Sequence, residues 1–375
     1  MYLASLQLES FRNYSAMSAR FSPGLNVIFG DNAQGKTNLL ESIAFVATGK
    51  SHRTSRDQEL IQEGKTSLTA RATVERKTGE MLLELTLGHD SRKQLKINGV
   101  AEKKIARLVG NLAVVFFSPD DLQLLKGPPA GRRRFLDIEL SQISQTYLYH
   151  LMTYNRALAQ RNTILKQDPV DPALLSIYDE QLLQSGAQLV VRRAEAVRRL
   201  SVLAAQYHDL LSDGKEVLRL EYQSQGAEPE QSPELEEVFE RLFSQLQQRR
   251  REEIRRQVTL VGPHRDDIAF WINDRDARLY GSQGQQRTAV LAMKLAELQF
   301  MAEEIGEYPV LLLDDVASEL DPHRRHYLLS AVREGIQTFV SCTDLEDLMV
   351  RSWQMEHRLF RVKAGAIEWD TGGLT

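Results

Sequence analysis

The octapeptide GDNAQGKT, residues Gly30 to Thr37, decides the fold, because it matches the phosphate-binding pattern GxxxxGK followed by Ser or Thr. It directly follows the apolar segment Leu25 to Phe29, which predicts a buried strand. Helical apolar spacing then runs from Thr37 to Thr48 and ends at Gly49. A strand, a glycine-rich loop and a helix in this order predict an α/β domain that binds a nucleotide phosphate.

The residue types of this loop suit phosphate binding. Its two glycines let backbone N–H groups surround a phosphate, and the helix N-terminus adds partial positive charge. We expect Lys36 to reach the β- and γ-phosphate oxygens and Thr37 to bind Mg²⁺. The predicted nucleotide-binding residues of the loop are Gly30, Asn32, Ala33, Gln34, Gly35, Lys36, Thr37 and Asn38. The alternative is a glycine turn that simply precedes a helix.

A second stretch, PVLLLDD, ends in two acidic residues and supplies the predicted metal ligand of the site. Four apolar residues, Val310 to Leu313, predict a buried strand, and Asp314 and Asp315 follow at its end. We expect Asp314 to bind Mg²⁺ and Asp315 to polarise the attacking water, which makes Lys36 and Asp315 catalytic candidates. A capped turn is one alternative. A two-metal nuclease cluster of Asp314, Asp315, Glu319 and Asp321 is another, which the phosphate loop disfavours.

Composition sets limits on the function. The chain has 375 residues, enough for about two or three structural units. It carries 47 Lys and Arg against 51 Asp and Glu, a net charge of -4, so any nucleic-acid contact must use local basic patches. One cysteine, Cys342, cannot form an internal disulfide, and no long apolar block predicts a leader or a membrane span. A cytoplasmic protein without membrane contact is expected.

The two halves of the predicted site are far apart in the sequence. Residues 1–126 predict the N-terminal part of an ATPase head, which contains the phosphate loop. Glycine and proline then interrupt the chain, and residues 127–256 show helical spacing, which predicts a helical arm or second lobe. Residues 257–375 return to α/β texture and predict the C-terminal part of the head. A nucleotide-binding head that is split by an insertion is typical of ABC-type ATPases.

Residues Tyr280 to Arg287, YGSQGQQR, resemble the ABC signature LSGGQ and precede a helix that we expect from about Gln285 to Glu304. The Ser282 hydroxyl and the Gly284 N–H, together with Gln285, can bind a γ-phosphate at the helix N-terminus. Since the chain's own loop already holds its nucleotide, this cap must serve a second copy. The pattern therefore predicts an ATP-dependent homodimer in which Ser282 is catalytic in trans; a plain helix cap is the alternative.

Five stretches together resemble the RecF family over essentially the whole chain. They are FRNY at Phe11–Tyr14, the phosphate loop, GPHRDD at Gly262–Asp267, the signature at Ser282–Arg287, and LDDVASELD at Leu313–Asp321. The resemblance implies a head similar to those of SMC proteins and a slow, DNA-stimulated ATPase of recombinational repair and replication-fork maintenance, with ATP and Mg²⁺ as cofactors. It further implies an ATP-driven dimer that clamps gapped or junction DNA, with RecR and RecO as partners that help RecA to load.

The resemblance also implies roles for further residues. Arg12 and Asn13 would lie near the nucleotide, although a plain turn between strands is the alternative. Ser318 to Asp321 would form a D-loop at the dimer interface. Cys342 follows the next strand where ABC transporters carry a switch histidine, and an aspartate, Asp315, replaces their catalytic glutamate. Both departures predict slow turnover. Gln123 is only a candidate for the Q-loop glutamine.

Basic residues near the loop and the arm are candidate DNA contacts: Lys50, Arg53, Arg56, Arg132 and Arg133. A solvated charged face is the alternative for each of them. No basic stretch is interleaved with aromatic residues, so we expect recognition of the duplex backbone rather than base stacking.

Two other functions remain open on the sequence alone. One is the ATPase subunit of a membrane transporter, and the other is a DNA-binding scaffold in which hydrolysis is incidental.

Overall fold

The computed structural model describes residues 1–54, 56–89, 92–225, 234–315, 324–325, 327–328, 335–345 and 357–371. The chain divides into two compact units, one of Met1–Asp121 with Glu297–Thr375 and the other of Leu122–Ala296. The sequence analysis assigned residues 257–296 to the head, whereas their contacts group them with the second unit. The signature stretch is therefore part of the second unit.

A mostly parallel sheet forms the centre of the first unit, in the order β15-β14-β3-β13-β12-β8. Its strands are β3 (Leu25–Phe29), β8 (Val114–Phe117), β12 (Val310–Leu313), β13 (Thr338–Cys342), β14 (His357–Lys363) and β15 (Ala366–Thr371). All pairs are parallel except β14 with β15. Every residue of β12 and β13 is buried, which explains the continuous apolar run Val310 to Leu313 that predicted β12.

An antiparallel sheet in the order β2-β1-β4-β5-β6-β7 forms the other layer of this unit. Its strands are β1 (Tyr2–Phe11), β2 (Tyr14–Arg20), β4 (Ser67–Arg76), β5 (Gly79–Gly88), β6 (Gln94–Ile97) and β7 (Val100–Glu102). Burial alternates along β4, because one face of this sheet packs on the core and the other faces solvent. The described 3₁₀ turns of the first unit are Asp57–Leu60, Ile105–Arg107 and Pro119–Asp121.

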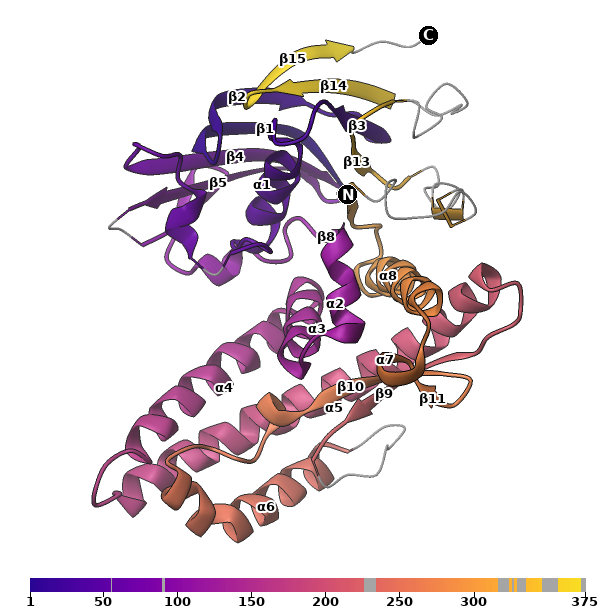
Figure 1. The fold of residues 1–375 in the computed structure, drawn as a ribbon. Helices are drawn as coiled ribbons and strands as arrows, with labels where there is room; N and C mark the ends of the chain where they lie inside the picture. The colour runs from indigo at the N-terminus through magenta and orange to yellow at the C-terminus, as the bar shows by residue number, and fades with distance from the viewer. Residues whose placement is uncertain are drawn as a thin grey trace. The chain divides into compact units, whose positions relative to one another are not determined.

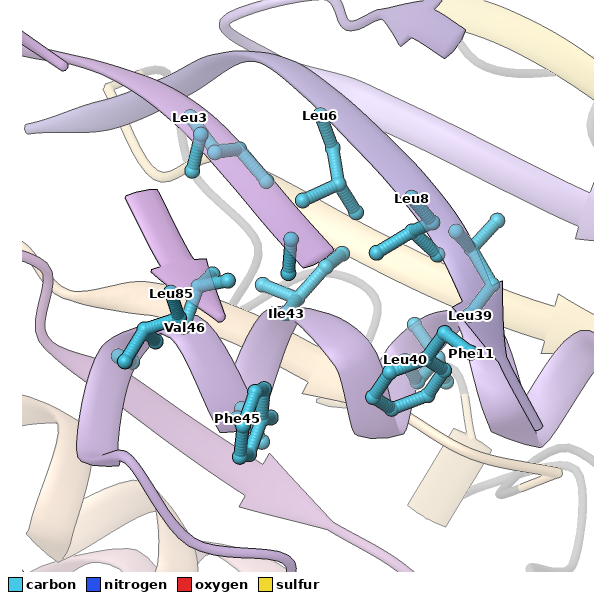
Figure 2. Packing of buried hydrophobic residues seen from close by; sticks show 14 of the residues in the cluster. Leu3, Leu6, Leu8, Phe11, Leu39, Leu40, Ile43, Phe45, Val46 and Leu85 are labelled. Atoms are coloured by element: carbon cyan, nitrogen blue, oxygen red, sulfur yellow. The ribbon is translucent and has the colours of Figure 1, made fainter. Parts of the chain in front are cut away.

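Helix α1 (Lys36–Thr48) packs against the inner face of the antiparallel sheet and so fixes the phosphate loop at its own N-terminus. Figure 2 shows the contact between the two elements. Leu3, Leu6, Leu8 and Phe11 of β1 face Leu39, Leu40, Ile43, Phe45 and Val46 of the helix, and all are fully buried or nearly so. Each such side chain contributes about 1.5–3 kcal/mol. The helix ends at Gly49, which adopts the left-handed conformation.

The second unit consists mainly of helices with one small sheet (Figure 1). Its helices are α2 (Leu122–Lys126), α3 (Pro129–Ile143), α4 (Gln145–Ile164), α5 (Pro172–Leu211), α6 (Leu235–Arg256) and α7 (Ala277–Tyr280), and α8 (Gln283–Ile305) begins in it. The strands are β9 (Leu218–Gln223), β10 (Asp267–Ile272) and β11 (Arg275–Asp276), in the order β11-β10-β9, and Pro263–Arg265 forms a 3₁₀ turn. Ser144 and Asp171 cap α4 and α5 with their side chains. No helix among the described residues is both long and apolar enough to span a bilayer.

Buried ion pairs hold the helices of the second unit together. Arg161 is fully buried, and its guanidinium donates to Asp179 and to Glu253, each at 2.6 Å. Removing one partner of the Arg161 ion pairs leaves an uncompensated charge and costs about 3–5 kcal/mol. In the GPHRDD stretch, Asp266 accepts from the Tyr222 hydroxyl at 2.6 Å. This stretch therefore stabilises the second unit.

Candidate functional site

The phosphate loop lies where the parallel strands of the first unit end. Phe29, the residue before the loop, pairs with Cys342 at the end of β13, and Leu313 pairs with Phe117. Because the carboxyl ends of parallel strands meet at one edge of a sheet, Asp314 and Asp315 lie at the same edge as the loop. The two stretches that the sequence separated thus form one site.

The side chain of Lys36 spans the phosphate loop. Its side chain is buried, and Nζ donates to the carbonyl oxygens of Gly30 at 2.7 Å and Asp31 at 2.9 Å. An ammonium group needs such partners when it is taken out of water. Two backbone carbonyls of the loop therefore hold the Lys36 ammonium over it.

Asp314 connects the acidic strand end to the loop helix. Its Oδ1 accepts from the Thr37 hydroxyl at 3.1 Å and from the Ser341 hydroxyl at 2.7 Å. Burial raises the pKa of Asp314 above its ordinary value and the neighbouring Asp315 adds to this, while the two hydroxyls oppose the shift. A hydroxyl and a carboxylate that converge are the oxygen donors that Mg²⁺ prefers, so the residues fit the predicted ion.

Asp315 has a strained backbone. Its φ is 51°, in the left-handed region that an aspartate adopts less readily than glycine, and its N–H donates to the Ser341 hydroxyl at 2.8 Å. Ser341 therefore bridges the two carboxylate residues, a role that the sequence analysis missed. It lies in the buried strand β13, and only the parallel pairing of β13 with β12 could have indicated its position.

The FRNY turn braces the loop from the side. Arg12 donates to both carboxylate oxygens of Glu41, at 2.9 and 2.7 Å, and Glu41 is fully buried on α1. Burial opposes ionisation of Glu41, but Arg12 and the Ser51 hydroxyl outweigh it, and the pKa of Glu41 lies below its ordinary value. Asn13 donates through Nδ2 to the Gln34 carbonyl at 2.9 Å. The guanidinium of Arg12 is thus bound to protein, and Asn13 contacts the loop directly.

The basic segment after α1 contacts the loop helix through one arginine. Arg53 donates to the Asn38 side-chain oxygen at 2.9 Å and lies 3.6 Å from Glu41, and 44% of its side chain is exposed. Asn38 in turn donates to the Asn13 side chain at 2.8 Å. Lys50 and Arg56 are exposed. This segment can present positive charge to solvent while it remains connected to the nucleotide site.

The signature turn lies in the second unit and starts α8. The Ser282 N–H donates to Gln285 Oε1 at 2.8 Å, and the Gln285 N–H donates to Ser282 Oγ at 3.2 Å, which is a reciprocal capping box. Helix α8 begins at Gln283, two positions before the predicted start. Ser282 is exposed and Gly284 half-buried. The helix cap that we gave as the alternative is present, at an N-terminus that solvent reaches.

The structure corrects the expectation that Arg132 contacts DNA. Its side chain is 3% exposed and donates to both oxygens of Asp267, at 2.6 and 2.8 Å, and to the Gly127 carbonyl at 2.8 Å. Arg133 is half-buried and donates to the Asp266 carbonyl at 2.7 Å. A guanidinium that is buried with a carboxylate cannot neutralise a phosphate without breaking that pair. Arg132 is therefore a structural residue of the second unit.

Some predicted residues lie elsewhere. The proposed D-loop, Ser318 to Asp321, lies outside the described residues, and so do Glu319 and Asp321 of the nuclease alternative. Within the part of the chain that is described, no group of three or more His, Cys, Asp or Glu residues is placed to hold a metal ion. Cys342 is buried at the end of β13. Gln123 is an exposed residue of α2.

Known proteins are similar to this chain in sequence. The model of the RecF/RecN/SMC N terminal domain family matches residues 2–368. The DNA replication and repair protein RecF of Symbiobacterium thermophilum is 69% identical over 375 residues, which cover all of both chains. RecF of Clostridium perfringens is 41% identical over 98% of this chain and all of the relative.

Solved structures agree. A structure of the recombination mediator protein RecF-ATPrS in the RecFOR pathway superposes with a TM-score of 0.89 at 34% identity and covers 98% of this chain and 97% of that one. An SMC head bound to the C-winged helix domain of ScpA gives a TM-score of 0.57 at 16% identity, covering 98% and 96%, and shares the fold. The predicted ABC-type ATPase head with an α/β fold is thereby confirmed.

Proposed function

Because the chain belongs to the RecF family, we propose that it is an ATP-dependent DNA-binding protein of recombinational repair that hydrolyses ATP slowly. The observation that carries this proposal is the convergence of Lys36, Thr37 and Asp314 at one sheet edge. RecF relatives are DNA replication and repair proteins, and the solved RecF structures are with ATP or ATPrS. Family membership also argues against a transporter subunit.

The chain's own residues support ATP binding as follows. Lys36 uses two of its three N–H donors on loop carbonyls and would offer the third to phosphate oxygens, and the first N–H groups of α1 would face the same charge. Thr37 and Asp314 would hold Mg²⁺, which when bound neutralises charge on the phosphates. Asp315, held by Ser341, would orient the attacking water and accept its proton.

We further propose that ATP joins two copies of the chain. The exposed Ser282 hydroxyl and the Gly284 N–H lie at the N-terminus of α8, where the helix dipole favours an anion. A second copy would supply that anion as the γ-phosphate of its bound ATP. The resulting dimer would close on gapped, duplex or junction DNA, and Lys50, Arg53 and Arg56 would contribute phosphate contacts. RecR, RecO and RecA are the proposed pathway partners, which the RecFOR pathway of the solved relative supports.

Sedimentation tests this proposal. The wild-type chain, Lys36→Arg and the control Lys65→Arg, an exposed lysine of the same unit, are spun with gapped, duplex and single-stranded DNA at two salt concentrations. Each is measured with ATP, ADP or no nucleotide. We expect ATP-dependent dimers on DNA for the wild type and the control only, because an arginine keeps the charge but not the geometry of Lys36.

Two outcomes would count against the proposal. Dimerisation and ATP turnover by Lys36→Arg at wild-type levels would contradict the assignment of the loop. Equal residence on DNA with ATP and with a non-hydrolysable analogue would favour the scaffold with incidental hydrolysis over a timed clamp.

A further inference from the structure

We infer that the turn between β14 and β15, residues Ala364 and Gly365, is a positioning element that holds the phosphate loop in its binding conformation. The turn and the loop are distant in sequence, but β14 runs parallel to β3. Arg361 of β14 pairs with Phe29, the residue that precedes the loop (Figure 1, where the hairpin is yellow). The turn that follows β14 therefore lies next to the phosphate loop that follows β3.

Two hydrogen bonds join the turn to a single loop residue. The Ala364 N–H donates to the side-chain oxygen Oε1 of Gln34 at 2.7 Å, and the Gly365 N–H donates to the Gln34 backbone carbonyl at 2.9 Å. Asn13 donates to the same carbonyl at 2.9 Å. Two turns from opposite ends of the chain thus fix one carbonyl group of the phosphate loop.

The orientation of this carbonyl determines what the loop offers to a phosphate. A trans peptide is planar, and its C=O and N–H point in opposite directions. Holding the Gln34 oxygen toward the two turns therefore directs the Gly35 N–H away from them. A rotated peptide would present an oxygen in place of that N–H and would repel phosphate. The turn acts on the nucleotide only through Gln34 and Gly35.

Close backbone contacts leave no space for a side chain between the turn and its neighbours. A Cβ on Gly365, whose φ is +74°, would lie 2.0 Å from the Asn13 carbonyl oxygen. At the start of the loop, a Cβ on Gly30 would lie 2.4 Å from the Val362 carbonyl oxygen of β14. Backbone atoms cannot rotate away as a flexible side chain can. An added methyl group must displace the turn, the loop or the FRNY turn.

A glycine is common at any tight hairpin turn, so the contact and not the conformation carries the inference. Gly64 separates the two. It lies in the same unit with a φ of +78°, and nothing lies within 4 Å of the Cβ position. Substituting Gly64 introduces the same backbone strain without the contact.

The test compares Gly365→Ala with Gly64→Ala in the full chain, and it rests on the proposed ATP binding. Thermal unfolding and titration with a fluorescent ATP analogue are measured for each. We expect both variants to lose thermal stability, Gly365→Ala more than Gly64→Ala because of the added contact with the Asn13 carbonyl. We expect Gly365→Ala to bind ATP about tenfold more weakly and Gly64→Ala to stay within about twofold of the wild type. Wild-type ATP affinity in a folded Gly365→Ala would overturn the inference. A wild-type chain that binds no ATP would refute the proposed function instead.

A second variant decides the question if Gly365→Ala does not fold. Gln34→Met keeps the length of the side chain but removes the oxygen that accepts from Ala364, so we expect ATP affinity to fall about fivefold. An unchanged affinity would overturn the inference. Where Gly365→Ala folds, the double variant should lose less ATP-binding free energy than the sum of the two single losses, because both changes disrupt the same contact between the turn and Gln34. Fully additive losses would also overturn the inference.

Discussion

Replacing Arg12 with alanine should lower the stability of the first unit more than it lowers the affinity for ATP. Arg12 donates twice to Glu41, which is fully buried, so the variant leaves a carboxylate without its bidentate partner. Stranding a buried charge costs about 3–5 kcal/mol. The Ser51 hydroxyl still donates to Glu41, and Arg53 remains 3.6 Å away, which together offset about 1–2 kcal/mol. The expected loss is about 1–4 kcal/mol.

Thermal unfolding of the full chain measures this loss. For a domain of about 200 residues, 1 kcal/mol corresponds to about 2–4 °C, so the first transition should fall by about 2–16 °C. Arg56→Ala, an exposed basic residue of the same unit, is the control and should stay within about 0.5 kcal/mol. Arg12→Lys should recover only part of the loss, because an ammonium cannot bind both carboxylate oxygens in parallel.

The pH dependence gives the prediction a second test. The pKa of Glu41 is lowered in the folded chain from its ordinary 4.5, so the stabilisation is present above pH 4.5 and is lost as the pH falls below it. The difference between the wild type and Arg12→Ala should therefore shrink below pH 4.5. A variant that unfolds like the wild type at pH 7 but binds ATP at least about tenfold more weakly would refute the reasoning and place Arg12 at the nucleotide.

Three further outcomes are expected. Ser341→Ala removes a hydrogen-bond donor to Asp314, so the pKa of Asp314, already raised by burial, should rise further. The acid limb of the pH profile of ATP hydrolysis should therefore move to higher pH. An unmoved limb would show that Ser341 does not control the ionisation of Asp314. Arg132→Ala should destabilise the second unit by about 3 kcal/mol in urea unfolding but leave the salt dependence of DNA affinity unchanged. Arg56→Ala should instead reduce the slope of DNA affinity against salt concentration by about one phosphate contact. The reverse result would restore Arg132 as a DNA contact. Ser282→Ala should cost about 1 kcal/mol of stability through the lost cap and should also abolish ATP-dependent dimers in sedimentation; persistent dimers would reduce Ser282 to a cap.

The local parts of the site could be predicted from the sequence. The strand Leu25–Phe29 was predicted with the bounds that the structure shows, and α1 begins one residue before the predicted start. Asp314 was assigned from its place after an apolar strand. These features depend on neighbours in the chain, and periodicity and loop chemistry are local properties.

The residues that brace the site could not be predicted in this way. Glu41 lies on α1, and the apolar spacing of that helix does not indicate whether a glutamate there is exposed or buried. Its partner Arg12 lies in the turn between β1 and β2, far away in the sequence. Ser341 and Gly365 reach the site through the parallel pairing of β13 and β14 with their neighbours. Strand order is a long-range property, so no pattern within a single segment indicates it. The same limit explains why Arg132 was assigned to DNA: its partner Asp267 lies in β10.

Hydrogen bonds join the polar groups of the site to one another and to the loop, and these bonds set how each group is positioned. Lys36 already donates to two carbonyls, and Thr37 already donates to Asp314. An ammonium has three N–H donors and a donating hydroxyl oxygen keeps its lone pairs, so Lys36 and Thr37 can contact a nucleotide and Mg²⁺ while they keep these bonds. The Gly35 N–H is directed by a peptide whose orientation the two turns have fixed beforehand, at no further cost on binding. Pre-orientation of the backbone should therefore add to ATP affinity beside Lys36, because a donor that is fixed before binding loses little entropy.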